Sequence, residues 1–314
     1  MADLDIVIVN WNAGHKLFEC LKSIQHSNAS EAFCLAKCIV VDNASTDDSL
    51  EKIKEIDLPL ELIVNAENKG FGSASNQGAR RGMSEYILFL NPDVRLFPDS
   101  LSKSFSFLEV AHDQKIGILG IQMIDQKNEI HRNTARFPTP TSLFYQMLGA
   151  DRLWPRKFPS LFMMDWTHMD SRVVDQVPGS FFLMRRSLFE ELNGFDERFF
   201  MYFEDLDLAY RASKAGWPSY YLSTVKAFHH GGGTTDQVKA RRLFYVLRSR
   251  IAYVAKHFGY YHAVWIVIAS LAMELWVRLG WSLLHLSARN FLEALEAYVL
   301  YVRELPALLK RIKK

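Results

Sequence analysis

The chain has 314 residues, 49% of them hydrophobic, which is enough for one large domain with an appendage or for two domains. Residues 241–314 hold twelve Lys or Arg and four Asp or Glu, so residues 1–240 carry a net charge of −6 within a chain of +2. This balance favours carboxylate and metal chemistry in residues 1–240. The basic residues 241–314 should face an anionic surface, and no nucleic-acid partner is expected.

The amino terminus lacks the features of a signal peptide. Residues 1–5 have no basic side chain and the apolar run covers only residues 6–9, so we expect a buried strand instead of a cleaved leader. The three cysteines, Cys20, Cys34 and Cys38, are odd in number and lack C-x-x-C spacing, which argues against a disulfide framework or a zinc site. We expect buried free thiols in a reducing cytoplasm.

The first ninety residues alternate short apolar runs with helical patterns. Strands are expected at residues 6–9, 38–41, 60–64 and 86–90, and helices at residues 16–25, 49–56 and 73–81. This alternation is typical of βαβ units, and it predicts an α/β fold with a mostly parallel sheet. Such a sheet binds its ligands beyond the carboxyl ends of its strands.

The four expected strands all end in polar residues. They are followed by Asn10, Asp42, Asn65 and the segment Asn91-Pro92-Asp93. Asn and Asp also favour ordinary turns, so each end taken alone has a structural explanation. Four polar ends at one edge of a sheet predict the lip of a binding pocket.

Two of these ends are suited to a nucleotide. The Asp42 carboxylate can accept hydrogen bonds from a ribose hydroxyl or a base N–H, although Thr46 or Asp47 nearby can also serve as a helix cap. The glycine-rich segment 68–73 precedes and begins a helix, so the backbone amides near Gly70 and the Lys69 side chain can bind a phosphate. The alternative is that the segment is only a turn from a loop into the helix. The first strand has no G-x-G-x-x-G after it, which disfavours hydride transfer.

Three further segments carry acids or histidines. Pro92 fixes a turn that leaves Asp93 pointing out of the strand end, where it suits a hard divalent cation, and His229 follows an apolar run beside three glycines. Residues 203–211 have helical spacing, with Glu204, Asp205 and Asp207 in the first turn. Acids favour a helix N-terminus for electrostatic reasons, but one in apolar surroundings gains proton affinity and suits a general base.

The remaining segments are less regular or more apolar. Residues 132–178 contain prolines and many aromatics, and we expect a long irregular connection that shapes an acceptor groove or a lid. Arg248 belongs to an arginine cluster on a helical pattern, which either is solvated or binds the phosphates of a lipid diphosphate.

Residues 263–286 are apolar but have a polar stripe at helical spacing, comprising Ser270, Glu274, Arg278, Ser282, His285 and Arg289. The uncharged run ends at Glu274 and is short for a membrane span, which needs about 20 residues. The stripe predicts a helix lying in the membrane interface, aided by the cationic tail 310–314; a hairpin packed on the protein or a dimer contact is the alternative.

Taken together, the motifs resemble those of the inverting GT-A glycosyltransferases of family 2, especially their rhamnosyltransferase-like branch. The resemblance covers roughly residues 4–260. It rests on an ordered set of segments: Ile8–Asn12, Val41–Ser45, Asn68–Gly72, Leu90–Asp93, Pro178–Arg186, Gly194–Phe200, Glu204–Asp207 and His229. It implies a GT-A catalytic domain with a Rossmann-like sheet over residues 1–237 and a basic, membrane-associating helical region over residues 238–314.

The resemblance also implies roles for particular residues. Asp42 resembles the residue that binds the nucleobase or ribose, and Asp93 with His229 resembles the site for Mg²⁺ or Mn²⁺. Asn91 stands where the family motif has its first Asp. Asp205 resembles the catalytic base. The remaining substrate-binding candidates are Asn10, Lys69, Gly70, Gly179, Ser180, Glu204 and Arg248.

The function implied is inverting transfer of a sugar, rhamnose in this branch, from a dTDP- or UDP-sugar donor to a saccharide or polyprenyl-diphosphate-linked acceptor. It would take place at the cytoplasmic face of the membrane, in cell-surface polysaccharide synthesis. A nucleotidyltransferase would need a glycine-rich basic loop after the first strand, where residues 10–14 supply only one glycine. A non-catalytic carbohydrate-binding protein on the same frame is the other alternative.

Overall fold

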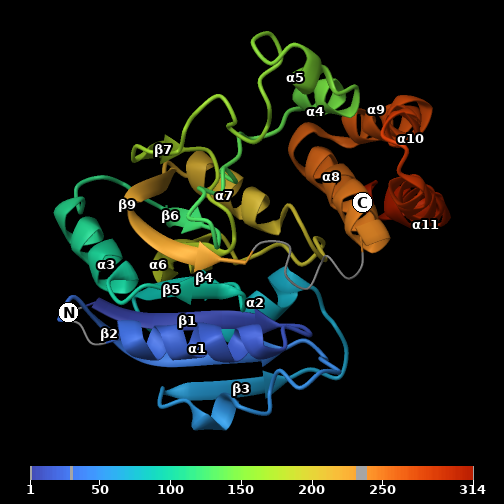
Figure 1. Ribbon diagram of the computed structural model, residues 1–314. Helices are drawn as coiled ribbons and strands as arrows, with labels where there is room; N and C mark the ends of the chain where they lie inside the picture. The colour runs from blue at the N-terminus through green and yellow to red at the C-terminus, as the bar shows by residue number, and fades with distance from the viewer. Residues whose placement is uncertain (1, 29–30, 231–238, 314) are drawn as a thin grey trace. The chain divides into compact units, whose positions relative to one another are not determined.

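The computed structural model describes residues 2–28, 31–230 and 239–313 (Figure 1). The chain forms two compact units, each assembled from separate stretches. The sheet unit comprises Met1–Ala135, Trp166–Glu197 and Glu204–Thr234; the helical unit comprises Arg136–Asp165, Arg198–Phe203 and Thr235–Lys314. The domain boundary expected at residue 237 lies outside the described residues, and the division at that position stays a prediction.

The sheet unit is built on one mixed sheet, in which the described residues form nine strands. Its first four strands in the path, in the order β3-β2-β1-β4, are all parallel, as expected from the alternating pattern. The bounds of these four are β1 (Ala2–Asn10), β2 (Phe33–Asp42), β3 (Leu60–Val64) and β4 (Tyr86–Leu90). Their apolar runs are buried along almost their whole length in β1 and β4, as is typical of a sheet covered on both faces.

The other half of the sheet mixes directions, which the sequence pattern did not indicate. The path continues β8-β6-β9-β5, and β7 pairs with β9. β8 runs antiparallel to β4 and β6, whereas β9 runs parallel to β6. These strands are β5 (Val94–Leu96), β6 (Ile118–Ile124), β7 (Arg172–Val174), β8 (Phe181–Arg185) and β9 (Ser219–His229).

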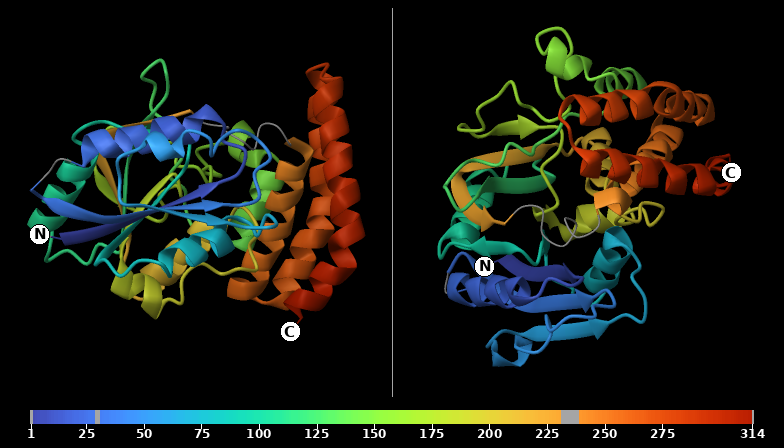
Figure 2. Two further views of the ribbon diagram at one scale, coloured as in Figure 1. Left: turned by 90° about the horizontal axis from the view of Figure 1, so that it is seen from below. Right: turned by 45° about the vertical axis from the view of Figure 1, so that its right-hand side comes forward.

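Helices cover both faces of this sheet. In the left view of Figure 2, α1 (His15–Ser27) lies on one face and α2 (Phe71–Ala79) on the other. α1 and α3 (Ser100–Val110) pack on the face that carries Ile6 and Ile8. α2 approaches the opposite face so closely that a Cβ at Gly78 would lie 2.5 Å from Val7, so only glycine fits there. α6 (Arg186–Glu191) and α7 (Glu204–Lys214) complete this unit.

Two expectations about local structure were wrong. The helix expected at residues 49–56 is a run of turns with only a short 3-10 helix, η1 (Ile53–Glu55). The Asp47 carboxylate accepts hydrogen bonds from Ser49 and from the amide of Gly14, so it joins two loops instead of capping an α-helix. The connection expected to be irregular at residues 132–178 contains α4 (Pro140–Met147), α5 (Ala150–Leu153) and β7.

The helical unit consists mainly of long helices near the carboxyl terminus. They are α8 (Lys239–Phe258), α9 (Tyr260–Ala269), a π-helical turn η3 (Ser270–Glu274), α10 (Leu275–Leu284) and α11 (Ala288–Ile312). The right view of Figure 2 shows α10 and α11 side by side. Among the described residues, Tyr260–Leu284 is long and apolar enough, by length and composition alone, to cross a membrane.

Half of the polar stripe of this unit points inward. Ser270, Glu274 and Ser282 are buried, whereas Arg278, His285 and Arg289 are exposed, as are the apolar residues Trp276 (65%) and Leu284 (79%). Glu274 forms ion pairs with Arg250 of α8 and with Arg278, and Ser270 donates a hydrogen bond to the same carboxylate. The segment α9–α10 therefore turns Ser270, Glu274 and Ser282 toward the interior of the unit and several of its large apolar residues outward.

The cysteines are free thiols, as expected, but the expectation that they are buried was wrong for one of the three. Cys20 on α1 and Cys38 on β2 are fully buried in the sheet unit, while Cys34, near the start of β2, is exposed. Burial raises the pKa of Cys38 to about 12, which keeps this thiol protonated and unreactive.

Candidate active site

The candidate residues gather at one edge of the sheet because of its strand directions. The parallel strands β1, β2, β3 and β4 all end at this edge, and the register pairs Asn10 with Asp42. β8 runs the other way, so it begins there, with Phe181 opposite Leu90. β6 and β9 again end at this edge, which brings His229 to it.

Asp42 is held in a buried hydrogen-bond network at the ends of β1 and β2. The Asn10 side-chain amide donates to Asp42 Oδ1 at 2.8 Å, and the Ser45 amide donates to Asp42 Oδ2 at 3.1 Å. Each carboxylate oxygen can accept a further hydrogen bond. The oxygen of the Asn10 side chain is buried and has no hydrogen-bond partner among the described residues, so it too can accept a donor from a ligand.

The glycine-rich loop is shaped by asparagine side chains. Asn43 Oδ1 accepts a hydrogen bond from the Lys69 amide at 3.0 Å, and Asn68 Oδ1 accepts one from the Gly70 amide at 2.9 Å. Gly70 has a φ of 82°, a left-handed conformation that favours glycine, and α2 begins directly after it. In the described part of the chain, no side chain caps this helix, so its first amides can meet an anionic ligand.

Asp93 and His229 form a close pair at the same edge. His229 Nε2 lies 3.3 Å from Asp93 Oδ1, because β5 begins directly after Asp93 and pairs Val94 with His229 of β9. Burial alone raises the pKa of Asp93, but the hydrogen bond and positive charge of His229, with the charge of Lys16, outweigh it. The pKa of Asp93 is therefore lower than usual, and its carboxylate is ionised at neutral pH.

This pair fits a divalent cation. Two ligands of one octahedral Mg²⁺ or Mn²⁺ ion, each at about 2.1 Å, lie about 3 Å apart, close to the spacing found between Asp93 and His229. In the described residues, no group of three or more His, Cys, Asp or Glu side chains is arranged to hold a metal ion. The protein would therefore supply two ligands and leave the others to a phosphorylated substrate and water, as is usual for Mg²⁺.

Asp205 and Glu204 stand at the start of α7, beside the glycine-rich loop. A Cβ at Gly72 of α2 would lie 3.6 Å from Glu204 Cβ. Asp205 Oδ2 accepts hydrogen bonds from the Gln176 side chain at 2.8 Å and from the Gly179 amide at 2.9 Å. Asp205 is partly buried and Glu204 is buried, and Glu204 Oε2 has no hydrogen-bond partner among the described residues.

The two adjacent acids have raised pKa values for related reasons. Burial raises the pKa of Glu204 well above its usual value, and the charge of Asp205 raises it further. Burial also raises the pKa of Asp205, although the hydrogen bonds to its carboxylate oppose the rise. A carboxylate with raised proton affinity can accept a proton from a hydroxyl more readily than an ordinary surface Asp.

A chain of contacts joins the two centres. The Asn91 amide donates to the Ser180 carbonyl at 3.1 Å, and the preceding residue, Gly179, donates to Asp205. The Ser180 hydroxyl is buried without a hydrogen-bond partner among the described residues. The Asp93 centre and the Asp205 centre therefore share the edge formed by the end of β4 and the start of β8.

One candidate belongs to the other unit, and two neighbours of the site residues were not predicted from the sequence. Arg248 is on α8 of the helical unit, where its guanidinium is 3.9 Å from the Glu304 carboxylate. His131 lies beside His229, with 5.6 Å between the ring centroids, and Gln176 binds Asp205 directly. Nothing in the spacing of His131 or Gln176 distinguishes them in the sequence, because only the folded sheet brings them to the site.

Comparison with known proteins agrees with this geometry. Residues 5–193 match the model of glycosyl transferase family 2. The chain is 30% identical over 288 residues to N-acetylglucosaminyl-diphospho-decaprenol L-rhamnosyltransferase of Mycobacterium tuberculosis, a match that covers 86% of this chain and 91% of the relative. It is 29% identical over 197 residues to the rhamnosyltransferase WbbL of Escherichia coli, covering 60% and 70% of the two chains.

Solved structures share the architecture. The mannosyltransferase PcManGT of Pyrobaculum calidifontis, in complex with GDP-Man and Mn²⁺, matches with a TM-score of 0.54 at 15% identity, over 96% of this chain and 89% of that one. TarS of S. aureus, residues 1–349 with UDP-GlcNAc, matches with a TM-score of 0.53 at 15% identity, over 99% and 83%. These likenesses confirm the expected GT-A fold class.

Proposed function

Because the chain belongs to glycosyl transferase family 2, we propose that it transfers a sugar from a nucleoside-diphosphate donor to an acceptor hydroxyl with inversion of the anomeric centre. It is a glycosyltransferase whose sequence is rhamnosyltransferase-like. One observation carries the proposal: Asp205, a partly buried carboxylate with raised proton affinity, shares a sheet edge with the Asp93–His229 pair.

The donor is proposed to be a dTDP- or UDP-sugar, with rhamnose as the first candidate. Asp42 and Asn10 would accept hydrogen bonds from the nucleoside, and the Lys69 side chain and the amides after Gly70 would meet the phosphates. The rhamnose assignment is supported by the names of the relatives from M. tuberculosis and E. coli. TarS was solved with UDP-GlcNAc and PcManGT with GDP-Man, so the solved neighbours use more than one nucleotide.

Mg²⁺ or Mn²⁺ is the proposed cofactor, held by Asp93 and His229. Their 3.3 Å spacing and the ionised state of Asp93 support this assignment, as does the Mn²⁺ bound to PcManGT. The ion would neutralise negative charge on the departing diphosphate. Asn91 would leave the metal with less negative charge than two aspartates, which makes the contribution of His229 more important.

Asp205 is proposed to act as the general base. It takes the proton from the acceptor hydroxyl while the acceptor oxygen forms its bond to the anomeric carbon. The bond from that carbon to the diphosphate oxygen breaks, and the nucleoside diphosphate leaves from the opposite face. One displacement inverts the configuration and needs no covalent enzyme intermediate. Gly179, Ser180 and Glu204 surround Asp205 and would position the two sugars.

The acceptor is proposed to be a saccharide linked to a polyprenyl diphosphate, at the cytoplasmic face of the membrane. The name of the M. tuberculosis relative includes such a lipid. In the helical unit, Trp276 and Leu284 of α10 and Leu292 and Val299 of α11 are exposed, which is the behaviour of a surface that meets lipid. The cationic tail at Lys310 and Arg311 would attract anionic headgroups, and Arg248 remains a candidate for the acceptor phosphates.

The proposal is tested by turnover with defined substrates. Full-length protein would be given dTDP-rhamnose or UDP-GlcNAc, a synthetic N-acetylglucosaminyl-diphospho-polyprenol and Mn²⁺, with and without EDTA. We expect release of nucleoside diphosphate with one donor, loss of turnover in EDTA, and a product with inverted anomeric configuration by NMR. A retained configuration would contradict the mechanism, and release of pyrophosphate would indicate a nucleotidyltransferase instead.

A further inference from the structure

The two oxygens of the Asp205 carboxylate are in different situations. Oδ2 accepts two hydrogen bonds, from Gln176 Nε2 at 2.8 Å and from the Gly179 amide at 2.9 Å. Oδ1 accepts one, from the Leu206 amide at 2.8 Å. Since a carboxylate oxygen has two lone pairs, Oδ2 is fully engaged and Oδ1 has one lone pair left. The backbone at Gly179 also crowds Oδ2, because a Cβ there would lie 3.3 Å from it.

Gln176 is held rigidly by its own backbone. It is 5% exposed, and its amide and carbonyl both pair with Ala135, with N–O distances of 3.1 Å in each direction. Thr134, the residue before Ala135, bonds through its hydroxyl to the ring of His168. Gln176 is therefore fixed by a bridge that is itself anchored to a second buried group.

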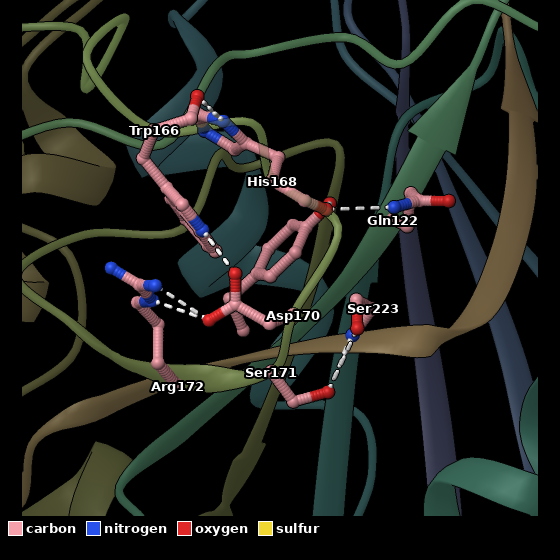
Figure 3. A network of polar contacts seen from close by, with 8 residues as sticks. Gln122, Trp166, His168, Asp170, Ser171, Arg172 and Ser223 are labelled. Carbon is pink, nitrogen blue, oxygen red and sulfur yellow. Dashed lines mark hydrogen bonds and ion pairs between the residues drawn. The ribbon is translucent and has the colours of Figure 1, made fainter.

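His168 is the centre of that second group, part of which is drawn in Figure 3. Its ring is fully buried and stacks on Trp166, with 4.1 Å between centroids. The Gln122 side chain donates to the His168 carbonyl at 2.8 Å, and the Tyr221 hydroxyl donates to the same oxygen. This packing limits the freedom of the segment that carries Gln176.

We propose that Gln176 is a positioning residue for the base: it fixes Asp205 Oδ2, so that Oδ1 is the oxygen that takes the proton from the acceptor hydroxyl. The inference rests on the proposed function, in which Asp205 is the base. The proton moves from the acceptor oxygen to Oδ1 as the new glycosidic bond forms and the nucleoside diphosphate leaves. Oδ1 then returns the proton to water after the product departs.

The hydrogen bond from Gln176 also affects when Asp205 is ionised. It stabilises the charged carboxylate, and so it opposes the rise in the pKa of Asp205 that burial causes. The adjacent Glu204 is the other titratable group coupled to Asp205, and its pKa is raised too. Removal of the Gln176 amide should therefore raise the pKa of Asp205. The pH range in which Asp205 is ionised, and so can accept a proton, becomes narrower.

The test uses Gln176→Met, which keeps the length of the side chain and removes the donor. Full-length protein labelled with ¹³C at the aspartate carboxyls would be titrated by NMR, with the Asp205 signal assigned by its loss in Asp205→Asn. We expect the Asp205 midpoint to rise by about one pH unit, a typical effect of one lost hydrogen bond to a charged group. In the pH profile of turnover with dTDP-rhamnose, the midpoint on the acid side should rise by the same amount, and the KM for the donor should stay nearly unchanged.

Gln25→Met is the matched control, because Gln25 is a partly buried glutamine of the same unit that bonds to the Asp57 amide and belongs neither to the His168 group nor to the contacts of Asp205. It should leave the Asp205 midpoint unchanged. Gln176→Asn, whose amide is too short to reach, is a second variant that should also raise the midpoint.

The outcomes separate this inference from the proposed function. An unchanged midpoint in both Gln176 variants, or an equal shift in Gln25→Met, would overturn the positioning role of Gln176. If the NMR midpoint of Asp205 shifts but the acid-side midpoint of the turnover profile does not, the positioning role is overturned as well. Full turnover by Asp205→Asn would instead remove Asp205 as the base, which is a failure of the proposed function.

Discussion

The sheet unit and the helical unit differ most in the apolar side chains that they expose. The sheet unit has an apolar interior that also holds the buried ion pair of Asp5 with Arg186, and its partly exposed acid Asp205 lies at the edge of the sheet. The helical unit buries the ion pairs of Glu274 with Arg250 and Arg278, and it exposes Trp276 and Leu284. The first arrangement suits water and a polar substrate, whereas the second suits a surface that accepts hydrocarbon.

The comparison predicts that loss of an acid has different consequences in the two units. In the sheet unit, Asp205→Asn should reduce turnover by about 10²–10⁴-fold, because it removes the base but leaves a side chain of the same shape. Donor affinity and melting temperature should change little. Asp113→Asn, a highly exposed aspartate of the same unit, is the control and should turn over normally. A control that lost as much activity would mean that Asp205 has no special role.

In the helical unit, Glu274→Gln should reduce stability. It leaves the Arg250 guanidinium buried and without its counter-charge, which costs about 3–5 kcal/mol when a buried pair is broken. Glu293→Gln breaks an exposed pair with Arg289 and should cost less than about 1 kcal/mol. Denaturant unfolding monitored by helical circular dichroism would measure both. Equal values would mean that the buried cluster does not hold the helices together.

A third variant tests the metal pair at the sheet edge. His229→Ala should weaken Mn²⁺ binding, measured by EPR in the presence of UDP, by at least about tenfold, since even residues that only support metal ligands have effects of this size. His112→Ala is the control, because His112 also lies beside an aspartate, at 3.2 Å from Asp113, but on the exposed surface. Unchanged Mn²⁺ affinity in His229→Ala would exclude this histidine as a ligand.

The smallest effect is expected at the exposed apolar surface. Trp276→Asp should weaken binding to vesicles that contain anionic lipid by about tenfold, because burial of a large apolar side chain contributes roughly 1.5–3 kcal/mol. Met83→Asp, at an even more exposed apolar position of the sheet unit, should have no effect. Vesicle flotation would measure both, and a wild-type protein that ignores vesicles, or forms a dimer through this surface, would contradict the lipid assignment.

Much of the fold could be predicted from local pattern. The family resemblance was confirmed, and the strands expected at 6–9, 38–41, 60–64 and 86–90 all lie within observed strands. The runs at 6–9, 38–41 and 86–90 are buried on both faces of the sheet, so they are continuously apolar and easy to recognise, whereas 60–64 is an edge strand with partly exposed residues. The helix predicted at residues 49–56 was wrong. The Asp47 side chain accepts a hydrogen bond from the amide of another loop, and no local pattern reveals this contact.

The candidate site residues were indicated in part by strand ends and in part by the family resemblance, which named Asp205, Gly179 and Ser180. Asn10, Asp42 and Asp93 follow parallel strands, whose carboxyl ends meet at one edge by topology. Gln176 was not indicated by the sequence. It is placed beside Asp205 by a backbone bridge to Ala135, 41 positions away, which no local pattern reveals. The polar stripe on α9–α10 was visible as a period, but a period alone does not tell which face of a helix points inward.

The cysteine arrangement provides a reporter for one unit alone. All three cysteines lie in the sheet unit, and only Cys34 meets solvent, whereas Cys20 and Cys38 are buried. A maleimide should therefore modify one cysteine in the native protein and all three once the sheet unit unfolds. Counting adducts by mass spectrometry would follow the integrity of the catalytic scaffold while detergents, vesicles or mutations act on the helices.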